Sequence, residues 1–246
     1  MSDPIKQFEQ ERIERIAGNA SNEELTKSAE AFNLASNKAL YSYNFSWMGR
    51  PIIQYPQDII AMQEIIWKIQ PDLIIETGIA HGGSIICYAS ILELIGKGEI
   101  LGIDIDIRAH NRAEIEKHPM FKRIKMIQGS SISNEVLDKV KEVAKDKKTI
   151  LVLLDSNHSH EHVLAELELY APFVSKDSYI VVFDTIVERM PDDYLPGAKR
   201  PWGVGNNPMT AVDAFLKTND QFVTDEEIDN KLLISVAPRG YLKKVK

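Results

Sequence analysis

The chain lacks the features that mark secreted, membrane-spanning and nucleic-acid-binding proteins. Cys87 is the only cysteine among 246 residues, so no intrachain disulfide can form. No apolar run is long enough to cross a bilayer, and the polar stretch from Met1 to Glu14 has no apolar core of a signal peptide. The formal net charge is -7, whereas binding to a phosphate backbone needs clustered Lys and Arg. We therefore expect a cytoplasmic protein whose partners include neither nucleic acid nor a membrane.

The sequence also lacks the Gly-x-Gly-x-x-Gly fingerprint of dinucleotide-binding folds. Instead, the apolar run Leu73-Ile74-Ile75 leads into Glu76-Thr77-Gly78, and Gly82-Gly83-Ser84 follows before a new apolar period begins. This order predicts a strand, a glycine turn and a helix start where a ligand can approach the backbone. The carboxylate of Glu76 favours a cationic ligand over a diphosphate. S-adenosylmethionine, with its amino group, sulfonium and ribose hydroxyls, fits that description.

The remaining pattern predicts an α/β protein with a doubly wound, mostly parallel seven-stranded sheet and an N-terminal helical extension. A hydrophobic content of 44% is enough for a full core. We place the extension at residues 1–56 and the S-adenosylmethionine-binding domain at residues 57–246. The extension is expected to contain a helix over Asp3–Ala17, a helix over Leu25–Leu40 capped by Ser21, and an irregular aromatic stretch over Tyr41–Tyr55.

In the larger domain, apolar runs and helical periods alternate along the chain. Helices are expected over Gln57–Gln70, Ile85–Ile95, Ile107–Lys117, from Ser133 through Ala144, from Ser156 through Tyr170, and over Ala211–Leu216. Parallel strands are expected over Leu73–Thr77, Glu99–Asp104, Arg123–Gln128, Thr149–Leu154 and Tyr179–Phe183. Two last strands, over Phe222–Thr224 and Lys231–Val236, are expected to pair antiparallel at the sheet edge. The Pro- and Gly-rich loop Pro191–Pro208 is long enough to suggest a functional role.

Four acidic residues stand at the carboxyl ends of predicted strands, where open α/β sheets bind ligands. They are Glu76, Asp104, Asp155 and Asp184. Nucleotide-binding folds place an acid on the ribose hydroxyls near the position of Asp104, with Asp106 as a second candidate, and the Ser130-Ser131 turn can face an adenine edge. Each acid can instead cap the helix that follows it, and for Asp155 alone the two roles are equally expected.

A run of histidines, His158, His160 and His162, follows Asp155. Three histidines suggest the ligand set of a metal-dependent hydrolase. Helical spacing would place His158 and His162 on one face and His160 elsewhere, which favours a carboxylate site instead. There Asp155 and Asp184 hold a divalent cation that lowers the pKa of a substrate hydroxyl, and His158 or His160 takes its proton.

Five segments of the chain resemble the cephalosporin hydroxylase family, which is similar to sugar and natural-product O-methyltransferases. The resemblance extends from Tyr41 to the C-terminus and implies a class I methyltransferase fold with, in some members, bound magnesium. Those members carry Glu-Asp after the fifth strand, where this chain has Phe183-Asp184, and Glu188 is close enough in sequence to substitute. The segments are Glu76–Ser84, Ile103–Asp106, Asp155–Val163, Val182–Thr185 and Arg200–Pro208.

We therefore predict an S-adenosylmethionine-dependent O-methyltransferase that acts on a hydroxyl of a sugar or small natural product. A metal-dependent hydrolase and a non-catalytic binding protein of the same fold are the alternatives, and assembly into a homo-oligomer is possible. The predicted catalytic residues are His158, His160 and Asp155, and the predicted magnesium ligands are Asp155, Asp184 and Glu188. The predicted cofactor-binding residues are Glu76, Gly78, His81, Gly82, Gly83, Ser84, Asp104, Ile105, Ser130, Ser131 and Asp155.

Overall fold

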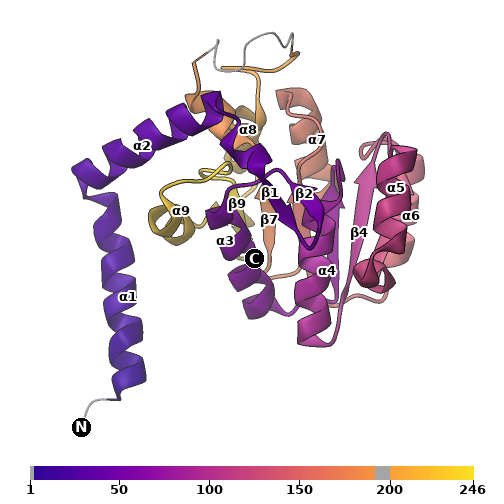
Figure 1. Cartoon of the computed structure of the whole chain (residues 1–246), viewed down its shortest axis with the longest axis horizontal. Helices are drawn as coiled ribbons and strands as arrows, with labels where there is room; N and C mark the ends of the chain where they lie inside the picture. Colours follow the sequence, from indigo (N-terminus) through magenta and orange to yellow (C-terminus); the bar gives the residue numbers. More distant parts are fainter. Residues whose placement is uncertain (1–2, 192–199) are drawn as a thin grey trace.

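The computed structural model describes residues 3–191 and 200–246, so part of the Pro191–Pro208 loop lies outside the described residues. A seven-stranded sheet with the order β5-β4-β3-β6-β7-β9-β8 forms the centre of the molecule (Figure 1). The strands from β5 to β7 are parallel, and β9 pairs antiparallel with both β7 and β8. The predicted architecture is confirmed. The strands are Leu73–Thr77 (β3), Glu99–Asp104 (β4), Ile124–Gln128 (β5), Ile150–Leu154 (β6), Tyr179–Val182 (β7), Phe222–Thr224 (β8) and Tyr241–Lys244 (β9).

The sheet is covered by helices on both faces, because side chains alternate between the faces along each strand. Ile74, Ile100 and Leu151 belong to the core on one face, together with residues of α3, α4, α5 and α9. Ile75 and Val152 belong to the core on the other face, together with residues of α6, α7 and α8. These helices are Pro56–Ile69 (α3), Gly83–Ile95 (α4), Ala109–Lys117 (α5), Asn134–Ala144 (α6), His160–Tyr170 (α7), Pro208–Thr218 (α8) and Glu226–Leu232 (α9).

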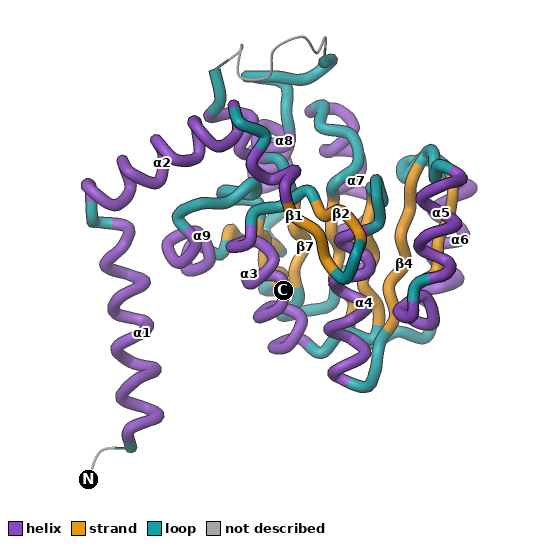
Figure 2. Tube along the Cα trace, viewed as in Figure 1, coloured by secondary structure: helices purple, strands orange, loops and turns teal. Residues whose placement is uncertain are grey.

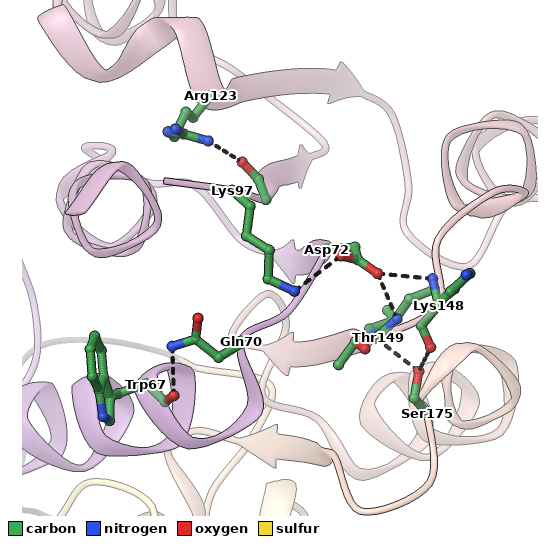
Figure 3. A network of polar contacts seen from close by, with 10 residues as sticks. Trp67, Gln70, Asp72, Lys97, Arg123, Lys148, Thr149 and Ser175 are labelled. Carbon is green, nitrogen blue, oxygen red and sulfur yellow. Dashed lines mark hydrogen bonds and ion pairs between the residues drawn. The ribbon is translucent and has the colours of Figure 1, made fainter. Parts of the chain in front are cut away.

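The central strands β3 and β6 are adjacent, and the chain crosses from β3 toward β4 and β5 on one side before it returns to β6 and β7 on the other. Their carboxyl ends therefore border the topological switch point of the sheet, where α/β proteins bind ligands. At the opposite end, Asp72 accepts hydrogen bonds from the backbone N–H groups of Lys148 and Thr149, each at 3.1 Å, and so joins the starts of the two strands (Figure 3).

The first part of the chain forms two long helices, Pro4–Ala20 (α1) and Glu23–Lys38 (α2), that extend to one side of the sheet (Figure 1). Asn19 Nδ2 donates to Asn230 O at 3.0 Å and ties the end of α1 to α9. Ser21 was the wrong capping residue for α2. The side chain of Asn22 accepts from Leu25 N at 3.0 Å, and so Asn22 is the N-cap.

The aromatic stretch that follows is more regular than expected. After a short 3-10 helix, Tyr41–Asn44, strands Phe45–Trp47 (β1) and Arg50–Ile52 (β2) form an antiparallel hairpin that packs against α4 (Figure 2). The connecting Met48 and Gly49 both have positive φ, 45° and 86°, as two-residue hairpin turns require. The hairpin lies within residues 1–56, and the proposed boundary at residue 57 stays a prediction.

The last strand was predicted at the wrong place. Lys231–Val236 is not a strand, because Glu226–Leu232 forms α9 and the edge strand β9 is Tyr241–Lys244. A buried carboxylate holds the segment instead. Asp58 of α3 accepts from Ser235 Oγ at 2.6 Å and from Val236 N at 2.9 Å, so the backbone of that segment has partners outside the sheet. Within the described ranges, no helix is long and apolar enough to cross a membrane.

Candidate active site

A pocket of about 440 Å³ opens at the carboxyl ends of the parallel strands, at the topological switch point. This volume falls within the range of small-molecule sites. Eleven of the residues that we selected from the sequence line it. They are Gly78, His81, Gly83, Ser84, Asp104, Ile105, Ser130, Ser131, Asp155, His158 and Asp184. Glu76, Gly82, His160 and Glu188 do not.

The glycines of the first turn make room for the chain itself. A Cβ on Gly78, which has φ +93°, would lie 1.9 Å from Asp155 O, and one on Gly83 would lie 2.1 Å from Pro51 O. Gly82, with φ +82°, faces the side chain of Ile115 in the same way. These positions therefore need glycine for close packing of protein segments, whereas we had expected close approach of a ligand.

The turn between Gly78 and Gly82 is held from three sides. Arg50 of the hairpin donates to His81 O through Nε and Nη2, at 2.9 and 2.6 Å, and its Nη2 also donates to Asn111 Oδ1. Asn111 Nδ2 donates to Ala80 O at 2.9 Å. Asp104 Oδ2 accepts from Ile79 N and Ala80 N, at 2.8 and 3.2 Å. The pocket wall is therefore ordered before any ligand arrives, and sequence spacing alone gave no sign of Arg50 or Asn111.

Glu76 is the last-but-one residue of β3 and is fully buried, two residues before Gly78, which lines the pocket. Neither carboxylate oxygen has a hydrogen-bond partner among the described residues. Burial raises the pKa of Glu76 to about 8, and the nearby Ser84 hydroxyl offsets part of the increase. A carboxylate without a partner next to a pocket is costly unless a ligand supplies a cation or a donor.

Asp155, His158 and Asp184 converge in the same pocket. One ligand atom from each lies within 4.8 Å of the others, and His158 Nε2 is 3.2 Å from Asp184 Oδ2. Burial raises the pKa of Asp155 well above its ordinary value, and the nearby carboxylates, Asp184 first, raise it further. Asp184 has φ 54°, an uncommon conformation for a residue other than glycine. Two carboxylates and an imidazole in this arrangement can bind a divalent cation or accept a proton.

The other predicted groups have partners elsewhere. Phe183 is buried in the core, so the chain supplies no third carboxylate from that position. Glu188 Oε2 accepts from Gly205 N at 2.8 Å and from Asn207 Nδ2, which attaches it to the loop before α8 rather than to the group of Asp155, His158 and Asp184. His160 Nδ1 is 2.8 Å from Thr210 Oγ1, outside the pocket.

The three histidines do not form a metal site. His158 lies before α7, which begins at His160, and the rings of His158, His160 and His162 have different neighbours. In the part of the chain that the structure describes, the one group of three or more potential ligand side chains is that of Asp155, His158 and Asp184. The hydrolase alternative required a three-histidine site and is therefore wrong.

Several lining residues had no role in the predicted site. Tyr43, Ile53 and Gln54 come from the aromatic stretch, for which we had left open a packed loop or part of a substrate cleft. Trp202 also lines the pocket; its ring is 5.1 Å from that of His158, edge to face, and the Arg200 guanidinium lies 4.5 Å from the Trp202 ring centroid. Trp202 therefore brings aromatic surface beside His158, and Tyr43 and Ile53 add aromatic and apolar surface to the same pocket, as a binding surface for an organic acceptor requires.

Comparison with known proteins bears on this pocket. Residues 39–245 match the model of the family described as rhamnosyl O-methyltransferase/CmcI. The chain is 31% identical over 204 residues to the rhamnosyl O-methyltransferase of Mycobacterium tuberculosis, covering 80% of this chain and 77% of that protein. The fold is similar to that of apo CmcI, with a TM-score of 0.58, 17% identity and coverage of 83% and 77% of the two chains. A CmcI structure with Mg and SAM gives a TM-score of 0.55, 17% identity and coverage of 83% and 78%.

Proposed function

Because this chain belongs to the rhamnosyl O-methyltransferase/CmcI family, we propose that it methylates a hydroxyl of a sugar or small natural product in the cytoplasm. It is an S-adenosylmethionine-dependent O-methyltransferase, and the resemblance seen in its motifs is confirmed. The observation that carries the proposal is the pocket at the switch point. The buried acid Glu76 lies on β3 just before the glycine turn that lines this pocket, and Asp155, His158 and Asp184 line the same pocket.

The pocket suits S-adenosylmethionine on physical grounds. The unpaired carboxylate of Glu76 fits a ligand that brings a cationic amino group. Asp104 lies at the end of the second strand in the sheet, the position from which nucleotide-binding folds contact ribose hydroxyls. When bound, the cofactor supplies a methyl group on a sulfonium, and the chain then has to align an acceptor oxygen with that carbon and accept the proton of the hydroxyl.

We assign proton removal to His158. Its ring lines the pocket, and the contact of its Nε2 with Asp184 Oδ2 at 3.2 Å orients the ring. The donor set of Asp155 and Asp184 also fits Mg²⁺, which would be held by these two carboxylates and would lower the pKa of the acceptor hydroxyl. With Phe183 at the position of a third carboxylate, we expect weak Mg²⁺ affinity.

Binding of S-adenosylhomocysteine, measured by calorimetry with the whole chain, tests the cofactor assignment. We expect binding at micromolar concentrations, and no heat alongside clear binding of NAD would refute the proposal. Methyl transfer is then assayed on a panel of sugars and small hydroxylated natural products. Cofactor binding with no transfer to any acceptor would favour a non-catalytic binding protein instead. A homo-oligomer stays a prediction, which light scattering would test.

A further inference from the structure

The glycine turn, residues 78–82, has a backbone conformation that its sequence does not favour. Ile79 O accepts from Gly82 N at 2.8 Å, so these four residues form a β-turn with Ala80 at its second position. Ala80 has φ 45°, and no positive φ occurs at His81. A positive φ at the second position alone is typical of type II′ turns, in which glycine is the usual residue there. The left-handed backbone of Ala80 therefore has to be maintained by its surroundings.

Arg50 holds this turn from the N-terminal hairpin. Its Nε and Nη2 atoms both donate to His81 O, at 2.9 and 2.6 Å. Nη2 also donates to Asn111 Oδ1 at 2.9 Å, and Asn111 Nδ2 donates to Ala80 O at 2.9 Å. The carbonyl groups of both central residues of the turn therefore depend on one guanidinium. Because a guanidinium presents its donors as a rigid planar fork, these contacts fix a direction as well as a distance.

The opposite edge of the turn leads to the carboxylate of Asp104. Asp104 Oδ2 accepts from Ile79 N and Ala80 N, at 2.8 and 3.2 Å. The peptide groups of Ala80 thus connect the contacts of Arg50 on one side with Asp104 on the other. A change in the backbone of Ala80 would therefore turn the Asp104 carboxylate away from the position that it has in the pocket.

Arg50 is outside the pocket that the turn lines. Ala80, His81 and Asp104 are lining residues, and Arg50 and Asn111 are not. A role of Arg50 in ligand binding therefore has to pass through the backbone of the turn or through the charge of the guanidinium.

The hairpin is attached to the rest of the molecule at other points as well. Trp47 Nε1 donates to Ser90 Oγ of α4 at 3.0 Å. The backbone of Pro51 packs closely on Gly83, where a Cβ would lie 2.1 Å from Pro51 O. The hairpin is thus fixed without the guanidinium of Arg50, which leaves the conformation of the turn as the particular contribution of that side chain.

We propose that Arg50 is a positioning residue for cofactor binding, which keeps Ala80 in the left-handed conformation that directs Asp104 into the pocket. The inference rests on the proposed function. An alanine that nothing holds adopts this conformation in roughly one molecule in ten, because its Cβ is then too close to the following carbonyl oxygen. The apparent affinity falls in proportion to the fraction of molecules in the competent conformation, so removal of the guanidinium should weaken binding about tenfold.

Calorimetry with S-adenosylhomocysteine and the whole chain tests this role. Arg50→Ala should weaken binding about tenfold. Arg50→Lys keeps the charge without the fork, and should still weaken binding at least about threefold. Trp47→Phe, which removes the bond to Ser90 from the same hairpin, is the matched control and should keep the wild-type affinity. A loss in Trp47→Phe as large as that in Arg50→Ala would show that Arg50 only fastens the hairpin.

A second substitution in the turn separates positioning from a general loss of structure. Glycine adopts positive φ about as readily as negative φ, so Ala80→Gly removes the need for support from Arg50. Arg50→Ala combined with Ala80→Gly should therefore bind S-adenosylhomocysteine within about threefold of Ala80→Gly alone, whereas Arg50→Ala costs about tenfold when Ala80 is present. A loss caused by a loosened hairpin would be the same with either residue at position 80.

Two further results would overturn the inference while the cofactor assignment stands. One is wild-type affinity in Arg50→Ala. The other is an equal loss from Arg50→Ala in the wild-type and Ala80→Gly backgrounds. A variant that does not fold is recognised by its thermal unfolding curve, and Arg50→Lys then takes its place in the same comparison. Absence of S-adenosylhomocysteine binding to the wild type would instead refute the proposed function and this inference with it.

Discussion

Replacing the unpaired carboxylate of Glu76 should stabilise the ligand-free protein at high pH. Burial raises the pKa of Glu76 from an ordinary value of 4.5 to about 8. Between these values the folded state keeps a proton that the unfolded state has released. The contribution of Glu76 to the free energy of unfolding is therefore fully present below pH 4.5. It falls as the pH rises toward 8 and changes little above pH 8.

The size of the effect follows from the two pKa values. At about 1.4 kcal/mol per pH unit, the ionisation of Glu76 lowers the free energy of unfolding by roughly 3–4 kcal/mol between pH 5 and pH 8. Glu76→Gln has nearly the same shape and does not ionise, so this loss should be absent in the variant. Other buried acids, such as Asp58, whose pKa burial raises to about 6, contribute equally to both proteins and cancel in the difference.

Urea unfolding at pH 5 and pH 8 measures the effect. We expect Glu76→Gln to gain several kcal/mol relative to wild type on going from pH 5 to pH 8, while the exposed Glu168→Gln should show no such gain. The same variant should bind S-adenosylhomocysteine at least tenfold more weakly, since a charged partner of the amino group is lost. A stability difference between Glu76→Gln and wild type that does not change with pH would refute the reasoning.

Three further predictions concern the site. His158→Ala should slow single-turnover methyl transfer about 10²–10⁴-fold without weakening S-adenosylhomocysteine binding. His160→Ala should keep most of the rate, because the His160 ring lies outside the pocket. A larger loss of rate in His160→Ala than in His158→Ala would exclude His158 as the base. Asp184→Asn should remove the activation of methyl transfer by added Mg²⁺, and a wild-type rate indifferent to chelator would contradict this. Gly83→Ala should lower stability in urea by about 1–3 kcal/mol, because its Cβ would lie 2.1 Å from Pro51 O; unchanged stability would show that the hairpin moves freely.

The parallel part of the fold follows from the sequence because its strands are buried on both faces. Leu73–Thr77 and Ile150–Leu154 have no exposed residue, so they appear as short apolar runs between helical periods. Glu99–Asp104 was predicted at its observed bounds for the same reason. The general rule for ligand sites at strand ends then places Asp155 and Asp184 at one edge of the sheet, whereas the local pattern gave neither the strand order nor the presence of His158 beside them in place of Glu188.

Segments that depend on distant polar partners could not be predicted in this way. The apolar run Lys231–Val236 looks like an edge strand, but Asp58, far away in the sequence, binds the Ser235 hydroxyl and the Val236 N–H. Arg50 of the hairpin likewise donates a hydrogen bond to His81 O in the glycine turn, 31 residues away in the sequence. Local patterns show which residues are apolar, and they do not show which distant carboxylate or guanidinium satisfies a backbone group.

The glycines of the first turn show a related ambiguity. A glycine required by close approach does not reveal what approaches it. At Gly78 the neighbour is the backbone of Asp155, and at Gly83 it is the backbone of Pro51. Since the protein occupies these positions, the specificity of the pocket has to depend on its polar side chains. Ser131, Asp104 and the ring of His158 line the pocket, and we propose that the first two contact the cofactor and the third the acceptor. Substitutions of the glycines should therefore change stability first, whereas substitutions of the polar groups should change affinity and rate.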